Sequence, residues 1–245
     1  MKCARVFDYW PRLVLEGEVA DLFQQVVDVF DRLGLWEDGI ELIGSWSFLL
    51  YQRHCGAPSY PLRTQDVDFL VPRIYPQREA VDLPGALAPM GFHVDFAPHG
   101  AISFIHPDLK IEFLTPDRGK GDRPTLNIKP LGIKAVQLRF LDMLFDRPLI
   151  VREGSVSVRI PNPMNFCLHK LIISRRRSRP DKAQKDLEQV VHLLPILDPV
   201  EFRSEVAKLP KKWREMILKS LARSRVLFPS EAASLGKFSL TSQNT

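Results

Sequence analysis

The 245-residue sequence lacks the features that mark membrane, secreted and zinc-thiolate proteins. No apolar run approaches the roughly 20 residues that a membrane-spanning helix needs. The first ten residues, MKCARVFDYW, contain no apolar core of the kind found in a signal peptide, so we expect a cytoplasmic protein with no membrane partner. The three cysteines, Cys3, Cys55 and Cys167, are far apart and lack the spacing of a metal site, which suggests a reducing compartment.

Charge is abundant but unevenly distributed. The net charge is +5, and the segment from Arg175 to Lys182 contains five basic residues and one acid. A local positive field of this kind favours polyanionic partners such as a nucleoside triphosphate or RNA. A solvated helix end has the same composition, so this segment alone does not predict a function.

Apolar periodicity and turn residues predict a mixed α/β (α+β) order of elements in the first two thirds of the chain. We expect, in order, a helix over 14–34, a strand over 39–44, a helix over 46–55, a strand over 66–72, a helix over 79–90, strands over 91–97, 101–107 and 110–116, a long loop over 116–130, a short helix over 138–145 and a hairpin over 149–160. These elements predict a mixed β-sheet with helices.

The pattern changes after Pro161, where only helices are expected. They cover 164–176, 181–195, 199–208 and 210–224, with Pro or Asp at their borders. We therefore predict three regions: a catalytic domain over 1–160, a helical domain over 161–230 and a disordered tail over 231–245.

Two short motifs carry the chemistry. The first is the Gly44-Ser45 turn that ends the strand over 39–44, where Ser45 is placed to cap the next helix. The second is the sequence Asp66-Val67-Asp68, which begins another strand. Residues i and i+2 of a strand face the same side of a sheet, so Asp66 and Asp68 are expected to lie close together.

These motifs together predict a site for a metal-loaded triphosphate. Two neighbouring carboxylates repel each other unless a cation lies between them, and Mg²⁺ or Mn²⁺ is bound by carboxylate and phosphate oxygens. The Ser45 hydroxyl and the free amides of a helix start suit a phosphate oxygen, and Gly44 lets the backbone approach closely. Each motif alone is also found in ordinary helix caps and strand ends, so the prediction rests on their combination.

A third carboxylate is usually needed to complete a two-metal site and to accept the proton of an attacking hydroxyl. Glu112, in the middle of the strand over 110–116, is our preferred candidate because an unpaired charge is costly there. Asp95, in the strand over 91–97, is the alternative.

Taken in order, Gly44-Ser45, Asp66-Val67-Asp68 and a later carboxylate strand resemble the nucleotidyltransferase superfamily with the polymerase-β-like fold. The stretch over 43–71 carries most of this resemblance. The gap between Ser45 and Asp66 is longer than is usual for that superfamily. It contains the proline-rich loop over 56–63, where an insertion costs little.

The C-terminal helices look like those of abortive-infection type toxins and antibiotic nucleotidyltransferases. This resemblance implies that Lys170 contacts the triphosphate and that Asp186, in a Lys-Asp-Leu helix, orders the site or the acceptor. Lys185 and Arg175 are further candidates for the same role.

The resemblance implies a Mg²⁺- or Mn²⁺-dependent enzyme that moves a nucleoside monophosphate from an NTP, such as ATP, to an acceptor hydroxyl. Asp66, Asp68 and Glu112 are the predicted metal-binding and catalytic residues, and Gly44, Ser45, Lys170 and Asp186 are the predicted nucleotide-binding residues. RNA, a protein and a small molecule are all open as acceptors. Two other readings stay open: an inactive nucleotide- or partner-binding module, and the toxin of a toxin–antitoxin pair.

Overall fold

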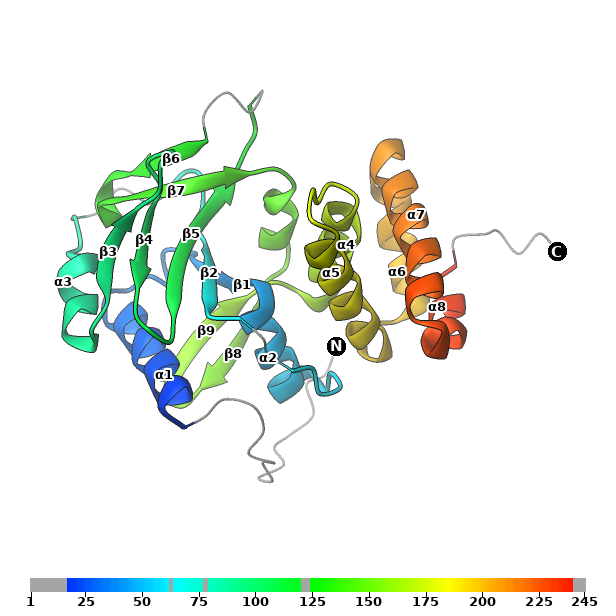
Figure 1. The fold of residues 1–245 in the computed structure, drawn as a ribbon, viewed down its shortest axis with the longest axis horizontal. Helices are drawn as coiled ribbons and strands as arrows, with labels where there is room; N and C mark the ends of the chain where they lie inside the picture. Colours follow the sequence, from blue (N-terminus) through cyan, green and yellow to red (C-terminus); the bar gives the residue numbers. More distant parts are fainter. Residues whose placement is uncertain (1–16, 62–63, 77–78, 120–123, 240–245) are drawn as a thin grey trace. The chain divides into compact units, whose positions relative to one another are not determined.

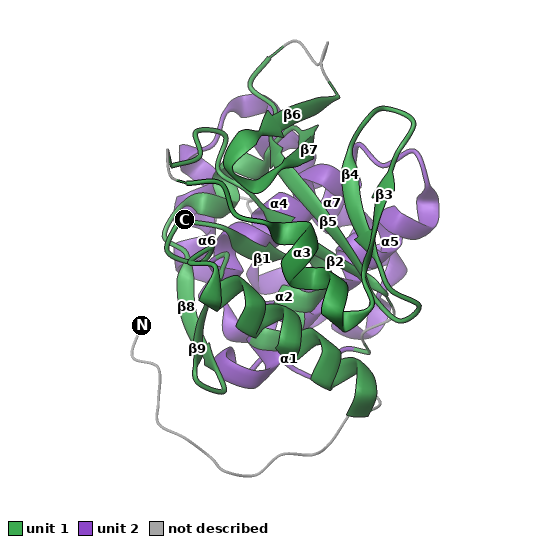
Figure 2. Ribbon diagram, turned by 90° about the vertical axis from the view of Figure 1, so that its left-hand side faces the viewer, with its two compact units in different colours: residues 1–50, 61–161 green, residues 51–60, 162–245 purple. Residues whose placement is uncertain are grey.

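A computed structural model describes residues 17–61, 64–76, 79–119 and 124–239. The chain forms two compact units, shown in different colours in Figure 2. The sheet unit consists of residues 1–50 and 61–161, and the helical unit consists of residues 51–60 and 162–245. Residues 51–60 group with the helices because Tyr51 packs edge-on against Phe166 and Tyr60 against His192.

The sheet unit is built on a mixed sheet. Its strands are β1 (Glu41–Ile43), β2 (Asp66–Leu70), β3 (His93–Phe96), β4 (Ile102–Ile105), β5 (Lys110–Pro116), β6 (Thr125–Ile128) and β7 (Ile133–Leu138). The main path runs β1-β2-β5-β4-β3, while β7 pairs with the end of β5 and β6 pairs with β7. β2 and β7 run parallel to β5, and the other pairs are antiparallel. A separate hairpin joins β8 (Leu149–Glu153) to β9 (Val156–Ile160).

Helix α1 (Gly17–Arg32) covers one face of this sheet (Figure 1). Its apolar residues recur at three- and four-residue steps, so they form one stripe that the sheet buries. The Phe30 ring lies 4.3 Å from the Phe69 ring and 6.3 Å from the Phe113 ring, measured between centroids. Gly34, at φ +66°, follows the helix as the predicted stop.

The opposite face is apolar at one end only. There Ile43 and Leu70 pack with Leu141 and Leu144 of the 3₁₀ helix η3 (Leu141–Phe145). The other end of that face carries the charged residues of β2 and β5. The remaining short elements of this unit are α3 (Leu83–Leu87), η1 (Ala88–Met90) and η2 (Lys129–Leu131).

Two predictions for this unit are corrected. The region predicted as a loop over 116–130 contains β6, and β7 precedes the short helix that we placed over 138–145. Both strands are short and pair mainly with each other, and Gly132, at φ +63°, makes the tight turn between them. Their stability comes from pairing between segments, which local sequence patterns do not reveal.

The helical unit contains α4 (Pro163–Ser174), α5 (Pro180–Leu193), α6 (Pro199–Lys208), α7 (Lys211–Leu227) and α8 (Ala232–Lys237), with the short helices η4 (Leu194–Ile196) and η5 (Pro229–Glu231). Proline occupies the first position of α4, α5 and α6, where its missing N–H costs nothing. The side chains of Asn162 and Asp198 cap α4 and α6. Within the described ranges, no helix combines the length and the apolarity that crossing a bilayer requires.

Part of the predicted disordered tail is ordered. Residues 232–237 form α8, and Leu235 is buried. The Phe238 ring meets the Phe202 ring edge-on at 5.2 Å, which fixes this segment against α6. Residues 240–245 lie outside the described part of the chain. The mixed sheet and the helical C-terminal region together confirm the predicted fold class.

Candidate active site

The Gly44-Ser45 turn leads directly from β1 into α2 (Gly44–Cys55). Gly44 has φ +72°, a left-handed conformation that favours glycine. A Cβ atom there would lie 2.5 Å from Asp68 Oδ2, so a larger residue would also displace the Asp68 carboxylate. The helix begins at Gly44 rather than after Ser45, which corrects the predicted cap: Ser45 lies buried in the first turn.

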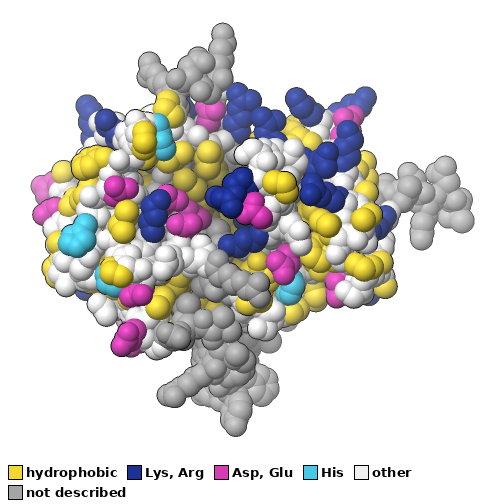
Figure 3. All heavy atoms as spheres, viewed as in Figure 1, with side chains coloured by type: hydrophobic (Ala, Val, Ile, Leu, Met, Phe, Trp, Pro, Cys, Tyr) yellow, Lys and Arg dark blue, Asp and Glu magenta, His cyan; other side chains and the backbone are white. Residues whose placement is uncertain are grey.

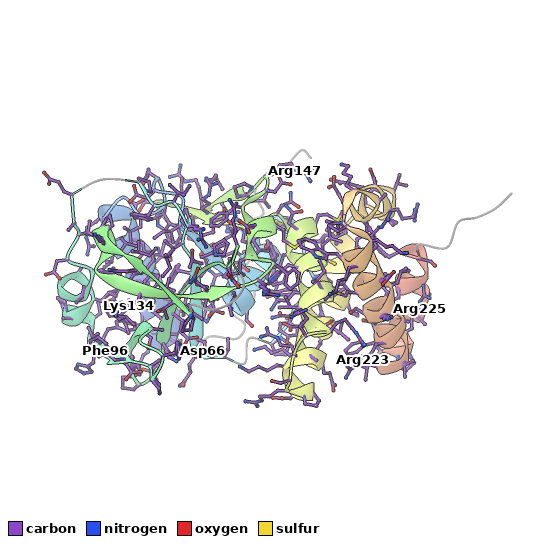
Figure 4. All side chains as sticks on the ribbon, turned by 90° about the horizontal axis from the view of Figure 1, so that it is seen from above. Asp66, Phe96, Lys134, Arg147, Arg223 and Arg225 are labelled. Carbon is purple, nitrogen blue, oxygen red and sulfur yellow. The ribbon has the colours of Figure 1, made fainter. Side chains whose placement is uncertain are left out.

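Asp66 and Asp68 lie on the same face of β2, as the period of two predicts. Val67 and Phe69, on the other face, are fully buried, whereas Asp66 is exposed and Asp68 is half-buried. Asp68 pairs with Ile43, the residue just before Gly44. The structure therefore brings the glycine turn and the carboxylate pair together at one end of β2; Asp66 is labelled in Figure 4.

The pairing register of the strands shows which of the two candidates for the third carboxylate, Glu112 or Asp95, lies near Asp68. Glu112 is the direct partner of Asp68 across β2 and β5, and Asp95 lies two further strands away, across Ser103. Since neighbouring strands are about 4.8 Å apart, the Asp95 backbone lies about 14 Å from that of Asp68, three strand spacings in all. Glu112 is therefore in reach of the Asp68 site, and Asp95 is not.

A lysine that the sequence analysis missed lies among these acids. Lys110 is two residues before Glu112 on β5 and is the register partner of Asp66. Its Nζ donates a hydrogen bond to Glu112 Oε1 at 2.5 Å. This bond to Glu112 raises the pKa of Lys110, and the charges of Asp66 and Asp95 add to the effect. The period of two that identified the acids also places Lys110 on their face.

The donor atoms on this face suit a hard divalent cation. Asp66, Asp68 and Glu112 present carboxylate oxygens, which are the ligands that Mg²⁺ prefers. Among the described residues, no three Asp, Glu, His or Cys side chains converge as a metal site in this conformation. Glu112 instead holds the Lys110 ammonium group. The carboxylates of Asp66 and Asp68 are chemically suited to such a cation, whereas Glu112 can bind one only after Lys110 releases it.

The other two predicted nucleotide contacts, Lys170 on α4 and Asp186 on α5, lie in the helical unit and bind each other. Lys170 Nζ donates to Asp186 Oδ1 at 2.8 Å, and Arg177 Nε donates to Asp186 Oδ2 at 2.7 Å. Lys170 and Asp186 are buried. Burial, the largest effect, raises the pKa of Asp186, but the two cations outweigh it and hold that pKa below its ordinary value. Arg177 as the partner of Asp186 was not predicted.

The neighbouring His169 is not a candidate acid or base. Burial, reinforced by the positive charge of Lys170, lowers the pKa of His169 to about 3. The imidazole is therefore neutral at physiological pH.

One buried carboxylate of the sheet unit was not predicted. Glu41 on β1 is fully buried, and its Oε1 accepts a hydrogen bond from Arg159 Nε at 3.1 Å. Among the described residues, nothing donates a hydrogen bond to its Oε2. Burial raises the pKa of Glu41 to about 7, although Arg159 opposes the shift. A glutamate in an otherwise apolar strand is the sequence signal that points to it.

Comparison with known proteins identifies the family of the chain. The family model described as nucleotidyltransferase matches residues 22–214. None of the curated proteins matches the chain.

Among solved structures, an antigenic nucleotidyltransferase-like protein from Paracoccidioides brasiliensis aligns with a TM-score of 0.51 at 13% sequence identity, over 91% of this chain and 94% of that one. That likeness shows a shared fold. The antibiotic-resistance factor ANT(2'')-Ia aligns with a TM-score of 0.42 at 12% identity, over 89% of this chain and 95% of that one.

The family match covers both motifs and helices α4 to α6. It also covers the face of β2 and β5 that carries Asp66, Asp68 and Glu112, which we call the acid face. The match confirms the resemblance to nucleotidyltransferases. The chain belongs to the nucleotidyltransferase family.

Proposed function

We propose that the protein is a metal-dependent nucleotidyltransferase that transfers a nucleoside monophosphate from an NTP to an acceptor hydroxyl. The observation that carries this proposal is the contact between the turn and the acids: a Cβ at Gly44 would lie 2.5 Å from Asp68 Oδ2. A backbone turn at a helix start and a carboxylate pair therefore share one small region, where a phosphate chain and its cation can be held together.

In this proposal Asp66 and Asp68 hold Mg²⁺ or Mn²⁺, which neutralises phosphate charge when it is bound. Gly44 leaves room for the phosphate chain, and Ser45 with the first amides of α2 binds its oxygens. The positive end of the α2 dipole favours the same negative charge.

Glu112 is the proposed base. The acceptor oxygen forms a bond to the α-phosphorus, the bond from that phosphorus to pyrophosphate breaks, and the hydroxyl proton passes to a Glu112 carboxylate oxygen. Lys110 must leave Glu112 Oε1 for this to occur. Once released, its ammonium group is on the correct face of β5 to pair with a phosphate oxygen.

Lys170 and Asp186 are proposed to act as one unit in nucleotide binding. Asp186 accepts from both Lys170 and Arg177, which leaves the group of three with a net positive charge. The fixed position of Lys170, with its Nζ 5.2 Å from the centre of the Phe166 ring, supports a role in which Asp186 orients the lysine.

The test is turnover of labelled NTPs with Mg²⁺ and a panel of RNA, protein and small-molecule acceptors. We expect metal-dependent transfer by the wild type and none by Asp66→Asn/Asp68→Asn. The matched control is Asp21→Asn/Asp31→Asn, which makes the same charge change on exposed positions of α1 and should retain activity. Absence of metal-dependent NTP use with every acceptor would contradict the proposal.

The ion pair between Lys110 and Glu112 favours one second candidate, a binding module that holds NTP without turning it over. Neutralised by a lysine, Glu112 does not complete a metal site in this conformation. Calorimetry with NTP and Mg²⁺ separates the two functions: tight binding without pyrophosphate release indicates the module.

A further inference from the structure

One end of the helical unit is strongly basic. The loop between α4 and α5 and the turn between α6 and α7 lie at the same end of these helices (Figure 1). The segments 175–182 and 205–215, which contain this loop and turn, hold nine Lys and Arg residues and three Asp and Glu residues. We call these two segments the basic end. Figure 3 shows Lys and Arg side chains gathered over this part of the helices.

Most of this charge is not neutralised within the protein. Arg179 pairs with Asp181 and Lys208 pairs with Glu205. In the ranges that the structure describes, no acid forms an ion pair with Arg175, Lys182, Lys211, Lys212 or Arg214, and all five are exposed. An excess of exposed cations creates a field that attracts a polyanion.

An apolar groove adjoins these cations. It lies between α6 and α7 and has a volume of about 370 Å³. Val206, Ala207 and Leu218 supply apolar lining, and Leu218 is 45% exposed. The charged lining residues are three cations, Arg203, Lys211 and Arg214, and one acid, Glu215.

The basic stretch continues along α7. Beyond Arg214 the helix carries Lys219, Arg223 and Arg225, and the last two are labelled on this helix in Figure 4. The only acid of α7 is Glu215, in its second turn. The positive surface therefore extends from the loop after α4 along a helix of 17 residues, or about 25 Å.

We propose that the basic end binds single-stranded RNA and that this RNA is the acceptor of the proposed transfer. An RNA strand alternates phosphates with bases, and unstacked bases seek apolar or planar contacts. This alternation matches a groove with an apolar lining beside exposed arginines and lysines. The identity of the acceptor rests on the proposed function, whereas RNA binding itself does not.

The test measures binding of a labelled single-stranded RNA to the full chain by fluorescence anisotropy, with EDTA and without NTP. The charge-reversal variant is Arg175→Glu/Lys211→Glu/Lys212→Glu. Arg177 is left unchanged because it pairs with Asp186. We expect the variant to lose affinity by about 30-fold or more near 0.1 M salt. The slope of log affinity against log salt should fall by about 2, as expected for three lost phosphate contacts.

Two controls make the result specific. Arg32→Glu/Lys129→Glu/Arg152→Glu changes the net charge equally at exposed positions of the sheet unit and should bind RNA within about threefold of the wild type. Asp66→Asn/Asp68→Asn should bind RNA as the wild type does even if transfer is abolished, so failure of the proposed function is distinguishable from failure of this one. Circular dichroism and urea unfolding confirm that each variant is folded.

Wild-type RNA affinity in the basic-end variant would overturn the proposal. So would equal loss in the control triple, because the effect would then come from net charge alone. Tighter binding of polyglutamate or of single-stranded DNA than of RNA would overturn the choice of RNA as the partner.

Discussion

The carboxylate pair on β2 and the buried carboxylate of the helical unit differ in how they meet solvent and neighbouring cations. On the sheet, Asp66 is exposed and Asp68 half-buried on one strand face, next to a glycine turn. In the helical unit, Asp186 is buried and accepts hydrogen bonds from Lys170 and Arg177. Removing one partner from the buried group leaves a buried charge without its counter-ion, whereas carboxylates that reach solvent are accessible to a cation.

The largest expected effect comes from the open pair. Asp66→Asn/Asp68→Asn should reduce the transfer rate on the order of 10³-fold or more, because the metal and the phosphate charge lose their support. The free energy of unfolding should stay unchanged or rise slightly, since two like charges are removed. Single-turnover kinetics and urea unfolding check both statements. A large loss of stability would show that this pair is structural and would remove the contrast between the two units.

The opposite result is expected for the buried carboxylate. Asp186→Asn leaves the buried Lys170 ammonium without its counter-ion, and loss of one partner of a buried pair costs about 3–5 kcal/mol. Urea unfolding measures this change. The control, Asp181→Asn, breaks an exposed pair with Arg179 and should unfold near the wild-type midpoint. If Asp186→Asn is as stable as the wild type but binds NTP weakly, Asp186 contributes to nucleotide binding and not to stability.

Glu41 should make stability depend on pH. Its pKa is raised from 4.5 to about 7 in the folded protein. Between these two pH values Glu41 is therefore protonated in the folded state and ionised in the unfolded state. The free energy of unfolding therefore falls as the pH rises from about 4.5 to about 7, by at most about 3 kcal/mol.

Glu41→Gln mimics the protonated form and should remove this decrease. Urea unfolding at pH 5 and pH 8 compares it with the wild type, and Glu18→Gln on α1 is the exposed control. A pH profile of Glu41→Gln that follows the wild type would show that another group causes the dependence.

The smallest expected effect tests Lys110. Lys110→Met removes a positive charge from the acid face, and repulsion of a divalent cation by a nearby half-buried charge that solvent partly screens is worth about 1 kcal/mol. Mn²⁺ affinity, measured by calorimetry without NTP, should rise about fivefold. Lys129→Met should leave it unchanged. A weaker affinity in Lys110→Met would mean that the lysine orients Glu112 toward the metal rather than competing with it.

Much of the candidate site could be predicted from the sequence because its residues follow patterns within short segments. A period of two places Asp66 and Asp68 on one face, and a glycine before a helix marks the turn. Their proximity, by contrast, depends on the pairing of Ile43 with Asp68, which joins strands separated by a whole helix and loop.

What could not be predicted depends on contacts between distant segments. Glu112 was preferred to Asp95 from the sequence, but only the strand order shows how far each of them lies from Asp68. β6 and β7 went unrecognised since each is short and is stabilised by its partner. Lys170 and Asp186 were chosen by resemblance, and only the packing of α4 against α5 shows that they bind each other. Their contact with nucleotide stays a prediction.

The most direct measurement is binding of Mn²⁺ together with a non-hydrolysable NTP, followed by electron paramagnetic resonance of the bound ion. The wild type and Asp21→Asn/Asp31→Asn should bind the metal and nucleotide together, and Asp66→Asn/Asp68→Asn should bind neither at the same concentrations. Equal binding of Mn²⁺ and NTP by the Asp66→Asn/Asp68→Asn variant would contradict the assignment of the nucleotide site to the glycine turn and the acid pair of β2.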